Sequence, residues 1–428
     1  MFEYSKGWVI TGANFGDEGK GRMTDVIAQK AEACVRFQGG ANAGHTVINE
    51  FGEFKLHQLP SGVFNANCLN ILGPGMVIDS AKLKLELEEL AQSEIFPRLL
   101  ISTRASLCLP LHELEDQWEE ERLGQQAYGS TGRGIAPAYK DRVAKKGVLV
   151  GWLQHPETLM QRLKLWLDWK QPQLLGLYPQ YENQISAFTP ETVFAHLMDT
   201  SSAWREWLGD TSHQIETMMS ANHTLVFEAQ LGASRDLTLG QYPWTSSSQV
   251  LSAFAGPLSG APWMIPANRL AVVKAFSSSV GTGTLVTAME PEKADGFRNH
   301  SGEFAATTGR ARDLGYFDAV ATKQGLKLQA ATAMALTKLD CLSGESEVKI
   351  CTSYSPHCSD PLSWPAVESA EPVYEVMPGW EQPIDHIRSF SELPIEAQNY
   401  VKRIEALCEV PVRYVSVGPH RDALIEIT

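Results

Sequence analysis

The hydrophobic and polar positions of this chain predict short strands that alternate with helices. Apolar runs, several rich in β-branched residues, predict buried strands at 8–11, 35–37, 69–77 (strand, turn, strand), 99–102, 224–228, 270–276 and 330–336. Apolar residues at helical spacing predict helices that begin near residue 22 and cover 80–92 (capped by Ser80), 112–123 and 396–407. Strands separated by helices indicate a parallel or mixed sheet. The pattern therefore predicts an α/β fold with a mostly parallel central sheet and helices on both faces.

Residues 151–223 are rich in Trp, Leu and Gln at helical spacing and carry no recognisable chemistry. Their tryptophans are expected to pack helices together rather than to stack on a ligand. We interpret this segment as a helical subdomain inserted into the sheet. Because no internal repeat or low-complexity linker is visible, residues 1–428 are expected to form one composite domain.

Glycines crowd the corner between the strand at 8–11 and the helix that follows it. They are Gly12, Gly16, Gly19 and Gly21. Glycine lets backbone N–H groups approach a phosphate closely, and the N-terminus of the helix favours negative charge. Lys20 stands where the lysine of a P-loop would reach the outer phosphates. A surface turn without a ligand is the alternative, but four glycines, a lysine and two acids at one corner favour a function. The predicted fold is therefore P-loop-NTPase-like.

This loop departs from a standard P-loop at two positions. Asn14 stands where the pattern needs glycine, and Gly21 stands where it needs Ser or Thr. The hydroxyl that normally binds Mg²⁺ is thus missing. Asp17 is the candidate replacement because Mg²⁺ prefers carboxylate and phosphate oxygens.

A second glycine loop, residues 38–46, follows the strand predicted at 35–37 and ends at His45 and Thr46. An isolated histidine is more often structural than catalytic. Because this loop can face the first one, His45 is a stronger catalytic candidate than an average histidine.

Three further polar segments carry candidate chemistry. Residues 128–134 combine Gly, Ser, Thr and Arg and are predicted to bind phosphate. The T-K-L-D sequence at 337–340 comes after an apolar run, and its aspartate can accept hydrogen bonds from N1–H and the exocyclic amine of guanine, so it favours GTP over ATP. Arg310 and Arg312 are spaced to present two guanidinium forks to a dicarboxylate or a phosphate.

Composition limits the class of protein. The formal charge of −14 argues against a general nucleic-acid or anionic-membrane surface. The seven cysteines show neither zinc-site spacing nor a disulfide framework. No apolar run approaches the roughly 18 residues that span a bilayer. We expect a soluble, cytoplasmic protein that acts on small molecules.

The sequences GDEGKG at 16–21 and QGGANAGHT at 38–46 resemble those of adenylosuccinate synthetases, and further matches along the chain extend the resemblance. That family is a homodimeric, GTP-dependent ligase that joins L-aspartate to IMP with Mg²⁺. The resemblance implies a two-step reaction, in which the γ-phosphoryl group of GTP moves to the 6-oxygen of the purine and an amine then displaces phosphate. It implies that Asp17, Lys20 and His45 are catalytic and that Asp17 and Gly44 bind the metal.

The resemblance also implies three groups of binding residues. The GTP-binding group is Asp17, Glu18, Gly19, Lys20, Gly21, Gly44, His45, Thr46, Lys338, Asp340, Ser416, Gly418 and Pro419. The acceptor-nucleotide group is Asn42, Thr131, Lys145, Gln230, Leu231, Ser246 and Val280. The aspartate group is Thr307, Thr308, Arg310 and Arg312. Lys145 stands where the family has an arginine supplied by the neighbouring subunit, so the charge is kept but the bidentate fork is lost.

The departures from the family pattern gather around the acceptor nucleotide. Leu231 aligns with a glutamine that touches the six-position of the purine, and Gln230 could replace that glutamine only with a one-residue shift. Arg235 stands where the family has an apolar residue, and Ser279 replaces an arginine. Ala41 replaces a polar residue, and the G-P-F-P-T-E stretch of the family reads differently at 283–288.

These departures leave alternatives open. The first is a divergent paralogue that uses another acceptor, such as GMP, dGMP or a specialised metabolite. The second is a GTP-binding sensor without catalysis, against which Asp17, Lys20 and His45 argue. The weakest is a Rossmann dehydrogenase, because the first loop lacks G-x-G-x-x-G spacing.

Overall fold

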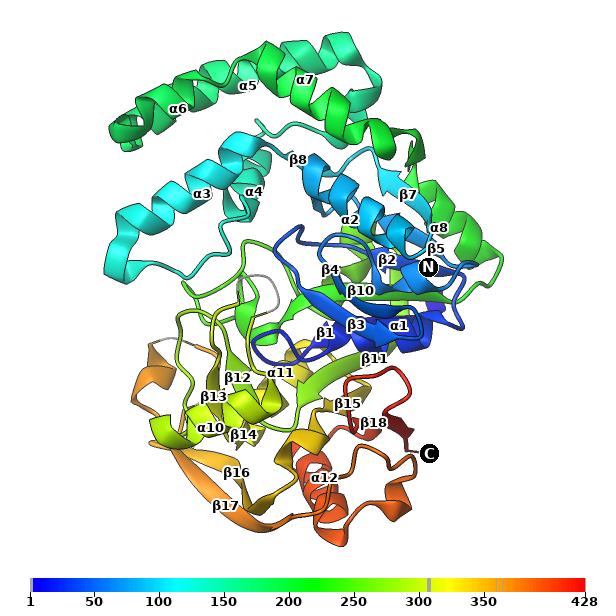
Figure 1. Cartoon of the computed structure of the whole chain (residues 1–428), viewed down its shortest axis with the longest axis vertical. Helices are drawn as coiled ribbons and strands as arrows, with labels where there is room; N and C mark the ends of the chain where they lie inside the picture. Colours follow the sequence, from blue (N-terminus) through cyan, green and yellow to red (C-terminus); the bar gives the residue numbers. More distant parts are fainter. Residues whose placement is uncertain (1–2, 306–308, 359, 364, 428) are drawn as a thin grey trace.

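The computed structural model describes residues 3–305, 309–358, 360–363 and 365–427. A ten-stranded sheet crosses the molecule (Figure 1). Its strand order is β19 (Leu424–Glu426), β18 (Val412–Ser416), β15 (Ala333–Thr337), β11 (Met264–Lys274), β1 (Glu3–Gly12), β10 (Leu225–Gly232), β2 (Ala33–Arg36), β5 (Leu69–Leu72), β7 (Arg98–Ser102) and β9 (Leu208–Gly209). Every neighbouring pair is parallel except β18 and β19. The predicted mostly parallel α/β fold is confirmed.

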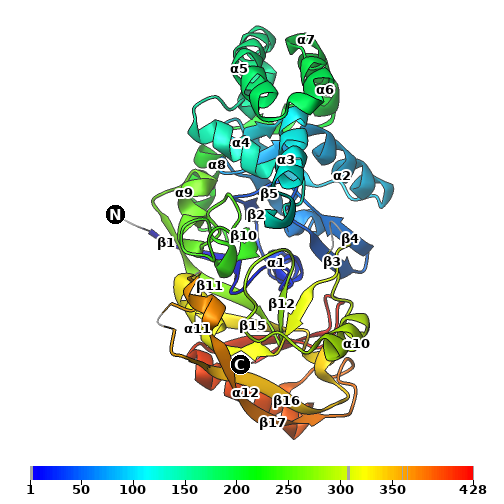
Figure 2. The ribbon, with the colours of Figure 1, turned by 90° about the vertical axis from the view of Figure 1, so that its left-hand side faces the viewer.

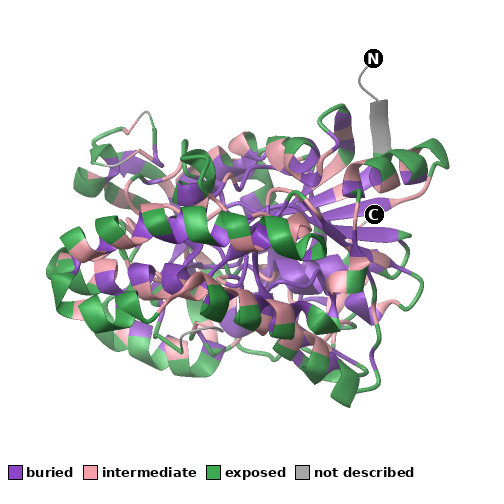
Figure 3. Ribbon diagram, turned by 90° about the horizontal axis from the view of Figure 1, so that it is seen from above, coloured by how far each residue is buried: buried purple, intermediate pink, exposed green. Residues whose placement is uncertain are grey.

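The central strands are apolar because both faces of the sheet are covered. All residues of β2 and β15 are buried, as are the residues of β11 from Leu270 onward. Near-continuous apolar runs of this kind are typical of parallel strands between helical layers. Figure 3 shows buried strands inside the molecule and exposed residues on the outer faces of the helices around them.

Helices flank the sheet. They include α1 (Lys20–Ala28), α2 (Ser80–Gln92), α8 (Thr211–Ser220), α9 (Ala255–Ser259), α10 (Pro291–Ser301), α11 (Ala319–Leu328) and α12 (Ile395–Cys408). The prediction that Ser80 caps α2 was wrong by one residue. The side chain of Asp79 accepts a hydrogen bond from the amide of Lys82, so Asp79 is the N-cap.

A helical layer lies beyond the β7 end of the sheet, at the top of Figure 1. It contains α3 (Pro110–Leu123), α4 (Ile135–Val143), α5 (Pro156–Leu177), α6 (Glu182–Ser186) and α7 (Pro190–Thr200). Trp166 and Trp204 are buried in its core, and Trp152, Trp169 and Trp207 pack against that core, as expected for helix packing. Because β9 joins the main sheet, this layer ends before residue 208. The division of the chain into domains stays a prediction.

Small sheets complete the fold. Three of them have two strands each: β3 (His45–Asn49) with β4 (Gly52–Leu56), β6 (Val77–Asp79) with β8 (Ser106–Cys108), and β12 (Ser277–Ser279) with β13 (Asp313–Gly315). The fourth has three strands, in the order β14 (Phe317–Asp318), β16 (Glu345–Ser355) and β17 (Glu371–Trp380). Figure 2 shows β16, β17 and α12 at the end of the molecule opposite α5 and α7. Within the described residues, no helix is both long and apolar enough to cross a membrane.

Candidate active site

A cavity of about 620 Å³ lies at the carboxyl ends of the central strands, between the loops of the sheet and the helices α3 and α4. Its walls come from the loops that follow β1, β2, β10 and β11, together with residues 128–131 after α3 and with Arg310 and Arg312. Loops at the carboxyl ends of parallel strands are the usual place for ligands in open α/β sheets. Of the candidate site residues, Asp17, Asn42, Gly44, Thr131, Leu231, Ser246, Val280, Arg310 and Arg312 line this cavity.

The loop after β1 is shaped around the carboxylate of Glu18. Oε1 of Glu18 accepts hydrogen bonds from the amides of Asn14 (3.2 Å) and Gly16 (2.8 Å), and its Oε2 lies 2.5 Å from Nζ of Lys20. Glu18 and Lys20 are both buried. The loop therefore gathers two backbone N–H groups and an ammonium group around the carboxylate of Glu18, which fixes its conformation. That the loop binds phosphate stays a prediction.

Two glycines allow this packing. A Cβ atom on Gly12 would lie 2.4 Å from Oε2 of Glu18, and one on Gly232 would lie 2.5 Å from Oε1. Both distances are far below van der Waals contact. A larger residue at either position would displace the Glu18 carboxylate and the loop that it holds.

Asp17 projects from this loop into the cavity. Its φ of 58° is unusual for a residue other than glycine, and its carboxylate lies 2.9 Å from Nη2 of Arg312. Non-glycine residues in this conformation cluster at functional sites. Gly44 lines the same cavity. A carboxylate and a carbonyl suit Mg²⁺, which keeps several positions for phosphates and water. The described residues contain no cluster of three acidic, His or Cys ligands that would hold a metal by itself.

His45 begins β3 and is paired with a buried acid. Its Nδ1 atom lies 2.6 Å from Oε1 of Glu228, whose carboxylate also accepts from the amide (2.7 Å) and hydroxyl (2.6 Å) of Ser61. Burial lowers the pKa of His45, and the negative charge of Glu228 opposes that shift. Burial would raise the pKa of Glu228, but His45, Arg36 and the hydrogen bond from Ser61 together outweigh it and hold that pKa below its usual value.

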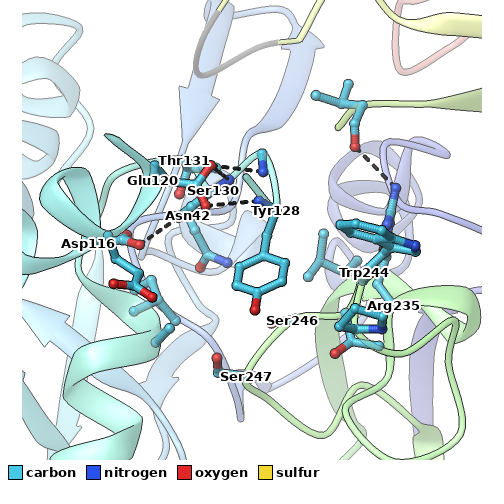
Figure 4. Close-up of a pocket in the computed structure, with 18 of the residues that line it drawn as sticks. Asn42, Asp116, Glu120, Tyr128, Ser130, Thr131, Arg235, Trp244, Ser246 and Ser247 are labelled. Atoms are coloured by element: carbon cyan, nitrogen blue, oxygen red, sulfur yellow. Dashed lines mark hydrogen bonds between the residues drawn. The ribbon is translucent and has the colours of Figure 1, made fainter. Parts of the chain in front are cut away.

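Carboxylates of α3 organise the loop at 128–134 (Figure 4). Glu120 accepts hydrogen bonds from the amides of Tyr128 (3.1 Å), Gly129 (2.8 Å) and Ser130 (3.0 Å). Asp116 accepts from the hydroxyl of Ser130 and from the amide of Gly134, at 2.8 and 2.9 Å. Three consecutive amides thus already surround a carboxylate of the chain itself, and Thr131 lines the cavity beside them.

The end of β10 presents Leu231 to the cavity and turns Gln230 away from it. Gln230 is buried with its amide packed against Gly39, where a Cβ atom would lie 1.6 Å from Nε2. Neither polar atom of the Gln230 side chain has a hydrogen-bond partner among the described residues. Leu231 has a φ of 58° and lines the cavity. In this structure Gln230 therefore does not take the position of Leu231.

The arginine loop meets the first loop at the cavity wall. Arg312 is buried and donates from Nη1 to Oε2 of Glu303 (2.7 Å) as well as contacting Asp17. Burial lowers the pKa of Arg312, but the two carboxylates outweigh that effect and raise it. Arg310 donates to the carbonyl of Gly129 at 2.9 Å. Thr307 and Thr308 lie outside the described residues.

The residues predicted to bind guanine lie together outside the cavity lining, around Arg22. The Arg22 guanidinium donates to the hydroxyl of Ser416, which donates to the carbonyl of Gly418 at 3.1 Å. Burial raises the pKa of Asp340, and the positive charges of Lys338 and Arg22 reduce this rise. Oδ1 of Asp340 is buried without a hydrogen-bond partner among the described residues. An orphaned buried carboxylate oxygen is suited to a ligand that donates hydrogen bonds.

Sequence reasoning did not identify Glu303, which connects these regions. Its carboxylate, fully buried, pairs with Lys274 (2.7 Å), Arg312 and Lys338. Lys145, in contrast, is exposed at the end of α4 and does not line the cavity of this chain. Its predicted role at a subunit interface stays a prediction.

Comparisons with known proteins agree on one family. The family model described as adenylosuccinate synthetase matches residues 9–425. Adenylosuccinate synthetase 2 of Pseudoalteromonas translucida is 54% identical over 417 residues, which cover 97% of this chain and 99% of that protein. Adenylosuccinate synthetase 1 of Methanosarcina acetivorans is 37% identical over 430 residues, with coverages of 97% and 99%.

One solved structure gives the same result, and a second shares the fold. The fully ligated adenylosuccinate synthetase from Plasmodium falciparum superposes with a TM-score of 0.89 at 28% identity, covering 99% of this chain and 100% of that one. Succinoaminodeoxyadenylate synthetase of cyanophage S-2L, bound to dGMP and dATP, has a TM-score of 0.61 at 16% identity over 99% of this chain and 96% of that one. The second similarity shows a shared fold only.

Proposed function

The chain belongs to the adenylosuccinate synthetase family, and we propose that it uses the cavity at the carboxyl ends of its central strands to join L-aspartate to IMP. As a member of this family it is a GTP-dependent C–N ligase of purine biosynthesis that uses Mg²⁺. The roles of individual residues are part of the proposal.

One contact supports this function most strongly. Arg312, in the loop suited to a dicarboxylate, lies 2.9 Å from Asp17, in the loop suited to phosphates. A reaction that first phosphorylates an acceptor and then adds aspartate needs these two sites side by side. Aspartate held by Arg312 would lie within reach of the group that accepts a proton from the purine.

In the first step, the γ-phosphoryl group of GTP moves to O6 of IMP while the carboxylate of Asp17 takes the N1 proton. Lys20 neutralises phosphate charge, and His45 donates a hydrogen bond as charge builds on the transferring group. Such positioning and electrostatic stabilisation carry most of the catalysis in phosphoryl transfer. With Nδ1 of His45 facing Glu228, donation comes from Nε2 and requires the imidazolium form.

In the second step, the amine of aspartate attacks C6 of the purine and phosphate leaves. The guanidinium forks of Arg310 and Arg312, with Thr307 and Thr308, hold the two carboxylates of aspartate. Asp17 and Gly44 are the residues that would hold Mg²⁺, and the bound ion would offset negative charge on the phosphates.

The remaining residues bind the two nucleotides. For GTP we propose the first loop (Glu18, Gly19 and Gly21), Thr46, and the cluster of Lys338, Asp340, Ser416, Gly418 and Pro419 around the base. For IMP we propose Asn42, Thr131, Leu231, Ser246 and Val280, which line the cavity, and we leave out Gln230, which faces away from it. We propose further that the protein is a cytoplasmic homodimer, in which the exposed Lys145 reaches the nucleotide bound by the other subunit.

Product analysis tests the function. Incubation of the protein with GTP, Mg²⁺, aspartate and IMP is expected to yield GDP, phosphate and adenylosuccinate in equal amounts, measured by mass spectrometry and phosphate release. The variant Asp17→Asn, which keeps the shape of the side chain, is expected to lower the rate by roughly 10²–10⁴-fold, as for loss of a general base. GTP hydrolysis without a succinylated product would refute the proposal.

A further inference from the structure

We propose that Arg235 is a positioning residue that ties the loop at 242–247 to the loop at 279–283 and thereby fixes the acceptor side of the cavity. This inference rests on the proposed function for its kinetic consequence, but its structural consequence does not depend on which acceptor is used. Arg235 ends a short 3₁₀ turn, Ala233–Arg235, directly after β10.

The guanidinium of Arg235 contacts both loops. Nη1 donates to the carbonyl oxygens of Trp244 (2.5 Å) and Thr282 (2.9 Å). Nη2 donates to the hydroxyl of Ser279 (2.8 Å) and to the carbonyl oxygen of Val280 (3.2 Å). The carbonyl of Arg235 itself accepts from the amide of Ser246 at 2.9 Å. Trp244, Ser246 and Val280 all line the cavity, so Arg235 contacts three of its lining residues, two through the side chain and Ser246 through the backbone.

The charge of Arg235 has no acidic partner among the described residues. Burial alone accounts for the lowering of its pKa to about 10, and the ring of Phe15 covers the guanidinium at 5.3 Å. A buried cation without a counter-ion is costly, and an apolar residue would fill the same space more cheaply. Because a guanidinium can donate to four acceptors in one plane, the geometry explains why an arginine stands here.

Further contacts join the two loops beside Arg235. A Cβ atom on Gly283 would lie 3.4 Å from both Nη1 of Arg235 and Cβ of Trp244. Gln241 adds a second connection from the same turn, since its Nε2 donates to the carbonyl of Thr284 at 3.2 Å. The ring of Tyr128 packs on that of Trp244, with centroids 6.0 Å apart (Figure 4). Trp244, which Arg235 positions, therefore also contacts the loop at 128–134.

Positions 235 and 279 are two of the departures from the family pattern. They lie 44 residues apart in the chain, yet their side chains meet at 2.8 Å. At these two touching positions the family pattern has an apolar residue and an arginine, whereas this chain has Arg235 and Ser279, so the arginine stands at the other position of the pair. The two substitutions behave as a single exchange.

The test uses Arg235→Leu, Arg235→Lys and a matched control, Arg269→Leu. Arg269 also donates to backbone carbonyls, those of Ala330 and Pro266, but does not line the cavity. In the free protein, Arg235→Leu is expected to increase hydrogen–deuterium exchange at 242–247 and 279–284, whereas Arg269→Leu leaves these segments unchanged. Unchanged exchange in Arg235→Leu would overturn the inference whatever the acceptor is. Should Arg235→Leu not fold, Arg235→Lys, which keeps the charge but not the fork, gives the same test.

Kinetics supply the second readout. Arg235→Leu is expected to raise KM for IMP by about tenfold or more, as for loss of charge-assisted hydrogen bonds, with KM for GTP within about twofold of the wild type. Adding Ser279→Arg to Arg235→Leu is expected to restore most of that loss. An equal rise in all KM values, or no rescue by Ser279→Arg, would contradict the exchange. A wild-type protein inactive with IMP would instead refute the proposed function and leave the hydrogen–deuterium measurement to decide the inference.

Discussion

Nδ1 of His45 lies 2.6 Å from Oε1 of Glu228, although the two residues are 183 positions apart in the chain. The carboxylate fixes the tautomer of the imidazole, so Nε2 is the ring atom that can face a phosphate. Burial lowers the pKa of His45, while Glu228 raises it. Glu228 therefore partly offsets the effect of burial and favours the protonated form of His45, which the proposed first step requires.

Replacement of Glu228 by Gln should shift the pH dependence of the reaction. Since the charge of Glu228 raises the pKa of His45, its removal lowers that pKa further, and the protonated fraction at a given pH falls. The basic limb of kcat/KM for GTP is then expected to move to lower pH, measured from about pH 5.5 to about pH 9, a range that brackets the ordinary histidine pKa. His45→Asn should lack that limb altogether. A profile of unchanged shape and reduced height in Glu228→Gln would mean that the acid only supports the fold.

Gly232→Ala is expected to disable the first loop by steric contact alone. The added Cβ atom would lie 2.3 Å from the carbonyl oxygen of Asn14 and 2.5 Å from Oε1 of Glu18. We expect kcat/KM for GTP to fall by about 10²-fold, because misplaced catalytic groups cost that much.

The matched control for that substitution is Gly176→Ala in α5, where an added Cβ atom meets nothing within 4 Å. This control is expected to keep full activity and to gain about 0.5–1 kcal/mol in unfolding free energy, because alanine is favoured over glycine in helices. Normal GTP kinetics in Gly232→Ala would show that the loop can relax around Glu18.

Glu120→Gln tests the support of the loop at 128–134. Its carboxylate accepts from three consecutive amides, and loss of the charge weakens all three hydrogen bonds. KM for IMP is expected to rise about five- to thirtyfold, on the basis of roughly 1–2 kcal/mol, while KM for GTP stays constant. Glu121→Gln on the same helix, whose carboxylate contacts only the hydroxyl of Tyr181 among the hydrogen bonds of the described residues, is the control. A lower KM for IMP would instead identify Glu120 as a competitor of the phosphate.

Asp340→Asn should change the base preference of the GTP site. The orphaned Oδ1 atom of Asp340 suits N1–H and the exocyclic amine of guanine, and asparagine replaces one acceptor with a donor. We expect KM for GTP to rise at least about tenfold and xanthosine triphosphate, which has a carbonyl in place of that amine, to become the better substrate. Steady-state rates with both triphosphates measure the ratio, and an unchanged preference would remove Asp340 from the base site.

Contiguous patterns in the sequence predicted most of the central sheet and both glycine loops. The strands of the sheet are near-continuous apolar runs, and the loops after β1 and β2 carry their glycines, Lys20 and His45 in short motifs, so both were found without coordinates. The N-cap of α2 was placed one residue late because Asp79 and Ser80 are both good caps and only the backbone geometry separates them.

The sequence does not identify residues that act through tertiary contacts. Glu303 and Glu120 each bring together groups from several segments, and nothing local marks them, apart from the four-residue spacing of Asp116 and Glu120 on one face of α3. The significance of Arg235 likewise depended on its distance to Ser279, since the two positions look unrelated in the sequence.

The most direct test of the central claim compares acceptors. Phosphate release from GTP is measured with aspartate and Mg²⁺ while IMP, dIMP, GMP, dGMP or no acceptor is supplied in parallel. We predict release that depends on both IMP and aspartate, with GMP and dGMP at the level of the reaction without acceptor. Stimulation by a guanine nucleotide, or by none of the acceptors, would contradict the account and indicate that the altered segment at 229–235 serves a different substrate.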